Sequence, residues 1–393
     1  MDIIIIGIAL ALLFNFANGL NDAANSIATI VATKALTPLQ AVLLAGVFNL
    51  LGPLLFTTAI AATIGRGIVD SSFLTPTLIL TALVGAMLWV LATSLLGIPV
   101  SSSHALIGGL LGAGIAGAGV GAVIWPSLTM IEQTAFYGII GIILGAVAVG
   151  AFTHWRGEFK PWHLLLGGII GVTVAIPLAI AAGLLHVSGI LAVILFIVIS
   201  PMLGFIVAFV FGIVVTCIFR NYAPWRVTGL FKILQIFSGS LQAIGHGGND
   251  AQNAMGIITA MLLAGGLISE FAVPLWVILA SSLAISLGTL LGGWRVIDKM
   301  ANRITRIRPY QGFAASTSAG GVLSLMNVFG VPVSTTHATT GAIMGVGATR
   351  GYSAVKWGVV REILIAWVLT IPASAVVAGL CYIVGYALIG GVF

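Results

Sequence analysis

Two polar motifs lie in otherwise strongly apolar parts of this chain, and each motif occurs twice. Residues 21–25 read Asn-Asp-Ala-Ala-Asn, and residues 249–253 read Asn-Asp-Ala-Gln-Asn. Residues 99–104 read Pro-Val-Ser-Ser-Ser-His, and residues 332–337 read Pro-Val-Ser-Thr-Thr-His. Carboxylates, amides and hydroxyls are costly in apolar surroundings, and a chain that places them there twice in the same order is predicted to build one polar site from two related halves.

The apolar background excludes a soluble globular domain. The chain is 60% hydrophobic and only 6% charged, whereas charged residues make up about 25% of soluble globular domains. We therefore expect an all-α polytopic membrane protein with the lipid bilayer as its partner. The net charge of +6 does not indicate nucleic-acid binding, because the basic residues are spread over short loops and form no continuous patch.

About twelve apolar segments are long enough to be considered as membrane-spanning helices. The first segment is expected to be interrupted at its polar motif, and the short segments after Pro99 and Pro332 are expected to be discontinuous or half-membrane helices. The twelve segments are 3–33, 40–64, 73–96, 101–120, 134–153, 162–183, 188–219, 232–263, 271–293, 311–330, 333–349 and 361–390.

The distribution of basic residues predicts the orientation of these segments. If the N-terminus is outside and every segment crosses, fourteen of the fifteen Lys and Arg residues fall in inside loops, and only Arg66 is outside. This asymmetry is typical of the positive-inside rule. We therefore expect a multi-pass protein of the cell membrane with both termini outside. No Lys or Arg precedes the first segment, so we do not expect it to be a cleaved signal peptide.

The duplication predicts an inverted-topology repeat. Asp22 and Asp250 are 228 residues apart, and His104 and His337 are 233 apart. The first motif is on segment one and its copy is on segment eight, so an odd number of crossings separates them and the copies face opposite ways. We expect one transmembrane domain over residues 1–393. Repeat 1 would occupy residues 1–155, connecting helices residues 156–228, and repeat 2 residues 229–393.

The Asn-Asp motifs have the chemistry of a cation site. On a helix, the motif side chains are three and four residues apart and can face one cavity. Carboxylate, amide and hydroxyl oxygens can replace the water around a small cation, and an aspartate can alternatively carry a proton. A purely structural role, in which polar groups join helices by hydrogen bonds, would explain the asparagines better than the aspartates. We assign the coupling cation to Asn21, Asp22, Asn249 and Asp250, with Na⁺ at Asp22 and Asp250.

The hydroxyl motifs have the chemistry of an anion site. Proline followed by Ser or Thr is typical of a helix start, and a helix that starts inside the membrane directs free N–H groups and its positive dipole end at a bound anion. Simple capping of a broken helix is the alternative. His104 and His337 could donate to substrate, relay a proton or brace the loop, and we favour bracing. The expected substrate-binding residues are Asn25, Ser101, Ser102, Ser103, Asn253, Ser334, Thr335 and Thr336.

Charge balance predicts the mode of transport. No Lys or Arg lies within the core of a segment that carries a motif. An oxyanion beside Asp22 and Asp250 would therefore accumulate like charge in a low-dielectric site unless a cation accompanied it. The sequence thus predicts symport with Na⁺ or protons. It contains no nucleotide-type phosphate loop, which argues against an ATP-driven pump. His246 is matched by Asn18 in the other copy, so it is given little weight.

At these residues the chain closely resembles the inorganic phosphate transporter (PiT) family, whose hallmark is a duplicated Gly-x-Asn-Asp-x-x-Asn segment. The first copy begins at Gly19, and the second has Gly247-Gly248 directly before Asn249. The resemblance implies cation-coupled uptake of inorganic phosphate by an elevator-like or rocking movement, commonly as a homodimer. It also implies no tightly bound cofactor beyond the coupling Na⁺ or H⁺. Only residues 220–232 join segments seven and eight, as in the compact prokaryotic form.

Several functions remain as alternatives to Na⁺-coupled phosphate symport. The first is proton-coupled symport of phosphate, of a metal-phosphate complex or of another oxyanion such as sulfate. The second is an intramembrane hydrolase that uses Ser101 to Ser103 with His104 and Asp22, but hydrolysis needs one nucleophile and one base and does not explain two inverted copies. The third is a channel, which a closed and charge-balanced site disfavours. We therefore expect a transporter without catalytic residues.

Overall fold

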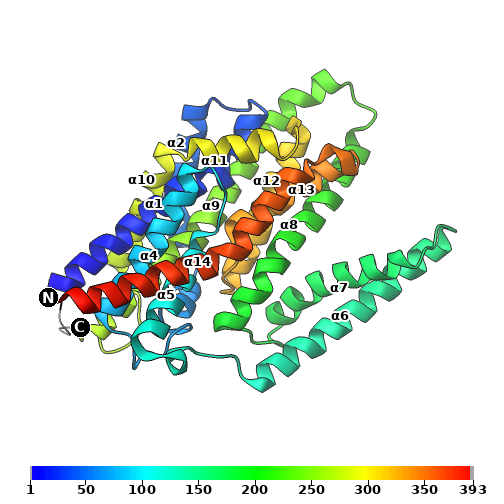
Figure 1. Cartoon of the computed structure of the whole chain (residues 1–393). Coiled ribbons are helices and arrows are strands. Elements are labelled where there is room, and N and C mark those ends of the chain that lie inside the picture. The colour runs from blue at the N-terminus through cyan, green and yellow to red at the C-terminus, as the bar shows by residue number, and fades with distance from the viewer. Residues whose placement is uncertain (1, 390–393) are drawn as a thin grey trace.

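The computed structural model describes residues 2–389, and these residues form helices joined by short loops (Figure 1). Among these residues, eight helices are long and apolar enough to cross a membrane. There are up to nine spans if α10 (Leu275–Leu291) is counted together with the helical segment Trp294–Arg303, which begins with α11 (Trp294–Asp298) and is bent by 66° from α10. The predicted all-α polytopic membrane fold is confirmed. The eight helices are α1 (Asp2–Ala32), α2 (Pro38–Leu55), α4 (Pro76–Leu95), α6 (Leu128–Trp155), α7 (Trp162–Ala181), α8 (Gly189–Phe219), α9 (Pro224–Ala264) and α14 (Trp357–Ile389).

The predicted count of twelve spans is not confirmed. The segments after Pro99 and Pro332 form α5 (Ser102–Ala118) and α13 (Thr335–Ala348), with 17 and 14 residues. At 1.5 Å per residue they are about 26 and 21 Å long, which is shorter than a bilayer core of about 30 Å. They match the half-membrane helices that were expected there. The remaining long helix, α12 (Pro309–Val328), has a buried polar face and is not among the eight apolar spans.

The helices break at other places than the sequence suggested. Segment 40–64 divides into α2 and α3 (Ala59–Arg66), and segment 271–293 ends in the bend between α10 and α11, where Gly292 has a φ of +66°. The predicted interruption of segment 3–33 is wrong, because α1 is one continuous helix that contains its polar motif. Asn and Asp side chains can remain in a helix when they exchange hydrogen bonds with groups on other helices. The backbone then does not need to unwind.

The helices of the two halves correspond in order and run in opposite directions. α1 matches α9, the pair α2–α3 matches α10–α11, and α4 and α5 match α12 and α13, whereas α14 packs on α4 and α5 and α6 packs mainly on α7. The 3₁₀ turns η1 (Val120–Ala122) and η3 (Tyr352–Ala354) follow α5 and α13. α1 and α9 are antiparallel, since Ile4 lies beside Gly265 at one end and Ile30 beside Gly239 at the other. The inverted-repeat prediction is confirmed, and the repeat boundaries at residues 155 and 228 stay a prediction.

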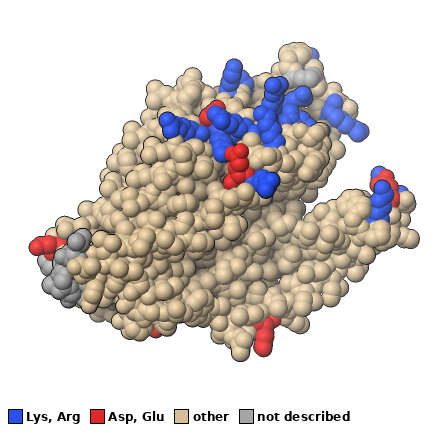
Figure 2. Space-filling model, viewed as in Figure 1, with Lys and Arg blue, Asp and Glu red and all other residues tan. Residues whose placement is uncertain are grey.

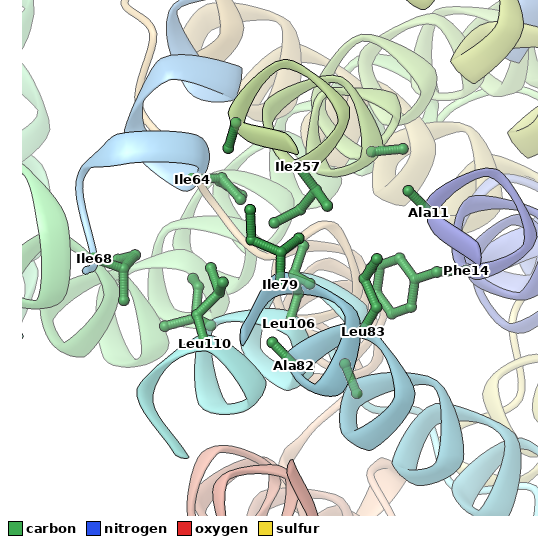
Figure 3. Packing of buried hydrophobic residues seen from close by; sticks show 14 of the residues in the cluster. Ala11, Phe14, Ile64, Ile68, Ile79, Ala82, Leu83, Leu106, Leu110 and Ile257 are labelled. Carbon is green, nitrogen blue, oxygen red and sulfur yellow. The ribbon is translucent and has the colours of Figure 1, made fainter. Parts of the chain in front are cut away.

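Apolar packing encloses the polar motifs on both sides. Figure 3 shows one cluster in which Phe14 of α1, Leu83 of α4, Leu106 of α5 and Ile257 of α9 pack together. A second cluster includes Ile27, further along α1, with Ile343 of α13 and Trp367 of α14. The Asn-Asp motif of α1 follows the first cluster along the helix, and its Ala23 and Ala24 belong to the second, so apolar packing adjoins its polar side chains in both directions.

The ends of the molecule differ in charge. The start of α1 and the end of α14 lie at the same end of the helix bundle (Figure 1). On the face shown in Figure 2, Lys and Arg gather over the opposite end and at the tip of the α6–α7 pair, which projects from the body. This segregation agrees with the loops predicted to be basic, while the side of the membrane that each end faces stays a prediction.

Candidate functional site

The two short helices begin beside the Asn-Asp motifs of the two long helices. Ser101 and Ser334 are the N-caps of α5 and α13, and their hydroxyls accept the backbone N–H of His104 at 3.3 Å and of His337 at 3.2 Å. Serine in this position satisfies an N–H that the first helical turn leaves free. The capping function predicted for the hydroxyl motifs is therefore present at Ser101 and Ser334, and the next two hydroxyl residues of each motif face the aspartates and asparagines.

The aspartates of the two repeats face each other. Oxygen atoms of Asp22 and Asp250 lie within 4.8 Å. Each carboxylate receives a hydroxyl from the short helix of its own repeat: Ser102 donates to Asp22 Oδ2 at 3.3 Å, and Thr335 donates to Asp250 Oδ2 at 3.1 Å. Asn21 also donates to Asp22 Oδ1 at 2.8 Å. The paired motifs thus form one site at the interface of the repeats.

The asparagines at the end of each motif reach across to the other repeat. Asn25 Nδ2 donates to Thr336 Oγ1 at 3.0 Å, and Asn253 Nδ2 donates to Ser103 Oγ at 2.9 Å. Thr336 in turn donates to Asp22 Oδ1 at 3.2 Å, so a hydroxyl of repeat 2 binds the carboxylate of repeat 1. These reciprocal contacts follow the two-fold relation between the repeats.

All twelve residues predicted for the site are buried, and the most exposed of them, Ser103, is only 8% exposed. Nine of them contact another of the twelve, while Ser101 and Ser334 cap their own helices. Asn249 is adjacent to Asp250, but its amide donates to Asn327 of α12 at 3.0 Å. The twelve are Asn21, Asp22, Asn25, Ser101, Ser102, Ser103, Asn249, Asp250, Asn253, Ser334, Thr335 and Thr336.

Several buried oxygens of the site lack a hydrogen-bond donor among the described residues. They are Oδ1 of Asn21, Asn25, Asn253 and Asp250. Leaving a buried acceptor unpaired costs about 1–3 kcal/mol. Amide and carboxylate oxygens are also the hard ligands that bind small cations. The donor set therefore fits a cation such as Na⁺.

The electrostatics of the site also indicate a bound cation. Two carboxylate charges within 4.8 Å of each other repel by at least about 3.5 kcal/mol at an effective dielectric constant of about 20. The ion pairs that Lys and Arg form within residues 2–389 involve Glu158, Glu362 and Asp298, and none involves the two site aspartates. The site therefore needs a positive charge that does not come from a Lys or Arg side chain.

His246 of α9 is a site residue that the sequence interpretation missed. Its Nε2 lies 3.3 Å from Asp250 Oδ2, and its Nδ1 lies 3.0 Å from Asn49 Oδ1 of α2. Together with Asp22 and Asp250 it forms a buried cluster with ligand atoms within 4.8 Å of one another. The low weight given to His246 was wrong, and the signal that could have found it was its spacing of four residues from Asp250, which places both side chains on one helix face.

The two motif histidines lie together behind the hydroxyl motifs. The rings of His104 and His337 are 4.9 Å apart edge to face, and His337 stacks on Trp367 of α14 at 3.8 Å. Trp367 Nε1 also donates to the carbonyl of Pro99 at 3.1 Å, just before the first hydroxyl motif. This packing joins the starts of α5 and α13 to α14, as expected of bracing residues.

The arrangement does not resemble a serine hydrolase. Ser101 accepts the backbone N–H of His104, Ser102 donates to Asn18 at 2.5 Å, and Ser103 accepts from Asn253. In the described part of the chain, none of these serines is hydrogen-bonded to the His104 ring, so the nucleophile and base of a triad are not paired.

Inverted repeats that enclose a buried polar site between half-membrane helices define the class of secondary transporters. More narrowly, the chain belongs to the phosphate transporter family, whose pattern matches residues 18–161 and 132–378.

Individual relatives cover nearly the whole chain. It is 42% identical over 376 residues to the "Probable low-affinity inorganic phosphate transporter" of Rhizobium meliloti, covering 95% of this chain and 94% of the relative. It is 34% identical over 391 residues to the protein of the same name from Bacillus subtilis, covering 98% of each. A solved structure, named "The sodium-dependent phosphate transporter", is similar with a TM-score of 0.70 and 28% identity, covering 99% of this chain and all of that one.

Proposed function

We propose that the protein is a symporter that couples the movement of Na⁺ to the uptake of inorganic phosphate by alternating access. The observation that carries this proposal is the pair of facing carboxylates, Asp22 and Asp250, surrounded by unpartnered amide oxygens and without a Lys or Arg counter-ion. The names of the relatives support phosphate as the substrate, and the sodium dependence named for the similar solved structure supports Na⁺ as the coupling ion.

The proposed cation sites use the oxygens of the Asn-Asp motifs. Na⁺ would bind at Asp22 and Asp250, with Asn21 and Asn249 completing the motif residues that we assign to the cation. The unpartnered Oδ1 atoms of Asn21 and Asp250 are available for this purpose. One or two bound cations would cancel the repulsion between the carboxylates, so cation binding and closure of the site favour each other.

The proposed phosphate site lies between the starts of α5 and α13. Each helix directs backbone N–H groups and its positive dipole end inward. Ser102, Ser103, Thr335 and Thr336 would add hydroxyl donors, and Asn25 and Asn253 would add amides. Their present bonds to one another within the buried site would exchange for bonds to phosphate oxygens. Ser101 and Ser334 would contribute mainly by capping the two helices.

Coupling follows from the sum of charges. Phosphate beside two ionised aspartates without cations is a strongly disfavoured state in a low-dielectric site, whereas the fully loaded site is close to neutral. Reorientation of the loaded site would therefore be faster than reorientation of a partly loaded one. The inverted repeats supply the two alternative openings, and the breaks between α2 and α3 and between α10 and α11 are the expected flexible points.

Uptake of labelled phosphate into proteoliposomes tests the proposal. We expect an inward Na⁺ gradient to drive accumulation, and a pH gradient without Na⁺ to drive little. Accumulation that ignores Na⁺ but follows the pH gradient would replace Na⁺ by protons as the coupling ion. Competition by sulfate, and dependence on added Mg²⁺ or Ca²⁺, would distinguish phosphate from sulfate and metal-phosphate substrates.

Location, orientation and assembly complete the proposal. We place the protein in the cell membrane with both termini outside, which is supported by the basic residues at the end of the bundle opposite the termini (Figure 2). A homodimer is the assembly implied by the family resemblance. Light scattering of the purified protein measures the assembly, and labelling of single cysteines placed in the α1–α2 loop from either side of the membrane measures the orientation.

A further inference from the structure

A pocket separate from the motif site lies where the end of α8 meets the starts of α9 and α12. Its volume is about 320 Å³, and Arg220 and Arg308 line it together with an aromatic wall. Ligand pockets have volumes of roughly 300–1,000 Å³, so this one can hold a small ligand or part of a larger one. The wall residues are Phe219, Tyr222, Phe231 and Tyr310.

The two arginines of this pocket are not neutralised by the protein. Among residues 2–389, neither Arg220 nor Arg308 forms an ion pair with an Asp or Glu side chain. Guanidinium groups bind phosphate oxygens with matched, forked geometry. The pocket therefore has the charge and the donors for an oxyanion ligand.

The aromatic wall adds an apolar requirement. Phe231 is buried, and its ring centroid lies 4.9 Å from that of Phe219 and 6.2 Å from that of Tyr310. Arg220 directly follows α8, an apolar helix of 31 residues, which places the pocket at the boundary between lipid and water. A ligand that satisfies both parts has an anionic head and an apolar tail.

A neighbouring basic pocket provides a contrast. It has a volume of about 400 Å³ and is lined by Arg295, Lys299 and Arg303. There, Arg303 pairs with Asp298 at 3.0 Å, Lys299 pairs with Glu362 at 3.0 Å, and Arg295 donates to the backbone carbonyl of Leu95. All three basic side chains already have partners within the protein, so that pocket does not indicate an anionic ligand.

We propose that the α8–α9–α12 pocket binds one anionic phospholipid, with its phosphodiester at Arg220 and Arg308 and an acyl chain along the partly exposed rings of Phe219 and Tyr310. Basic pockets between membrane helices recognise lipid headgroups in this way. Inorganic phosphate has the same oxyanion but no chain to cover the aromatic wall. Because α9 carries Asp250 and α12 carries Asn327, the bound lipid joins α8 to both helices that support the repeat 2 half of the transport site.

Native mass spectrometry of the purified full-length protein tests this proposal. The probes are phosphatidylglycerol, phosphatidylcholine with the same acyl chains, and inorganic phosphate. We expect one retained phosphatidylglycerol, weak retention of phosphatidylcholine, and no displacement of the lipid by millimolar phosphate. The double variant Arg220→Gln/Arg308→Gln should bind phosphatidylglycerol roughly 30-fold more weakly, because each basic residue at a lipid surface contributes about a fivefold gain.

Arg303→Gln is the matched control, since it removes one positive charge whose guanidinium is already paired, and it should retain lipid like the wild type. Equal retention of the two lipids by the wild type would overturn the proposal, and this result does not depend on the folding of any variant. Undiminished binding in the double variant, or an equal loss in Arg303→Gln, would also overturn it. Displacement of the lipid by phosphate would reassign the pocket to the free anion.

Discussion

The two halves of the transport site share their hydroxyl contacts but differ in the residue one helical turn before the aspartate. In repeat 1 this residue is Asn18, whose side-chain oxygen accepts a hydrogen bond from Ser102 at 2.5 Å. In repeat 2 it is His246, whose ring lies 3.3 Å from Asp250 itself. The hydrogen bonds to the Asp22 carboxylate thus come from amides and hydroxyls, whereas Asp250 has an imidazole nitrogen 3.3 Å from its carboxylate.

This difference teaches that a duplicated site need not be used symmetrically. His246 Nδ1 donates to the side-chain oxygen of Asn49, so Nε2 of the neutral ring directs a lone pair toward Asp250, and a nitrogen lone pair is a poorer ligand for Na⁺ than an oxygen. Asp22 has no imidazole at that distance, and the hydroxyls of Ser102 and Thr336 beside it can serve as further oxygen ligands. We therefore infer that the repeat 1 half is the stronger cation site and that the repeat 2 half is tuned by His246.

The largest expected effect is the loss of the Asp22 charge. Asp22→Asn keeps the side-chain shape but removes the strongest cation ligand, and we expect coupled phosphate uptake to fall at least about 100-fold, equivalent to roughly 3 kcal/mol of binding. In Asp250→Asn, coupled phosphate uptake should fall less, by about tenfold. Initial uptake rates in proteoliposomes under a Na⁺ gradient measure both. Full uptake by Asp22→Asn would refute its function, and equal losses would remove the proposed asymmetry.

The next effect concerns the residues that break the symmetry. His246→Ala leaves Asp250 without its imidazole neighbour and the buried side-chain oxygen of Asn49 without its donor, and an unpaired buried acceptor costs about 1–3 kcal/mol. We expect uptake to fall roughly 10-fold or more. Asn18→Ala loses a neutral hydrogen bond to Ser102 and should reduce uptake only about fivefold. The Na⁺ concentration for half-maximal uptake should shift in His246→Ala and not in Asn18→Ala, and the reverse order would argue against our inference.

The smallest effect concerns the contacts that the repeats exchange. Ser103→Ala removes the acceptor of Asn253, and Thr336→Ala removes the acceptor of Asn25 together with a donor to Asp22. We expect the apparent phosphate affinity to weaken about fivefold in Ser103→Ala, at about 1 kcal/mol for its one hydrogen bond, and about tenfold in Thr336→Ala, at about 1.4 kcal/mol for its two longer ones. Concentration dependence of uptake gives both values. Thr336→Ser keeps the hydroxyl and serves as the control, and unchanged affinity in both alanine variants would exclude hydroxyl contact with phosphate.

Local sequence patterns predicted much of this structure because they reflect local physics. Apolar segments predicted membrane helices, and proline followed by hydroxyl residues predicted the starts of α5 and α13. The repeated motif predicted which polar residues would meet, since inverted copies place Asp22 and Asp250 at one interface.

The features that the sequence did not predict depend on partners far away in the chain. The motif of α1 stays helical because its side chains form hydrogen bonds with Ser102, Thr335 and Thr336. The sequence around the motif does not predict these distant partners. His246 is placed by the packing of α9 against α2, which brings Asn49 to its ring. The bend before α11 was missed because it depends on the conformation of Gly292, which an apolar pattern does not specify.

The reciprocal contacts also have a consequence for how the protein is made. Asn25 and its partner Thr336 are 311 residues apart. At a synthesis rate of about 5–20 residues per second, α1 waits roughly 15 to 60 s for α13 to emerge. During that interval Asp22 and Asn25 lie in an incomplete chain and lack their hydrogen bonds to Thr336. The site therefore closes only after α13 has been made, and a chain truncated before α13 leaves Asp250 in the bilayer without the hydroxyl of Thr335, an incompletely paired carboxylate by which membrane quality control can recognise it.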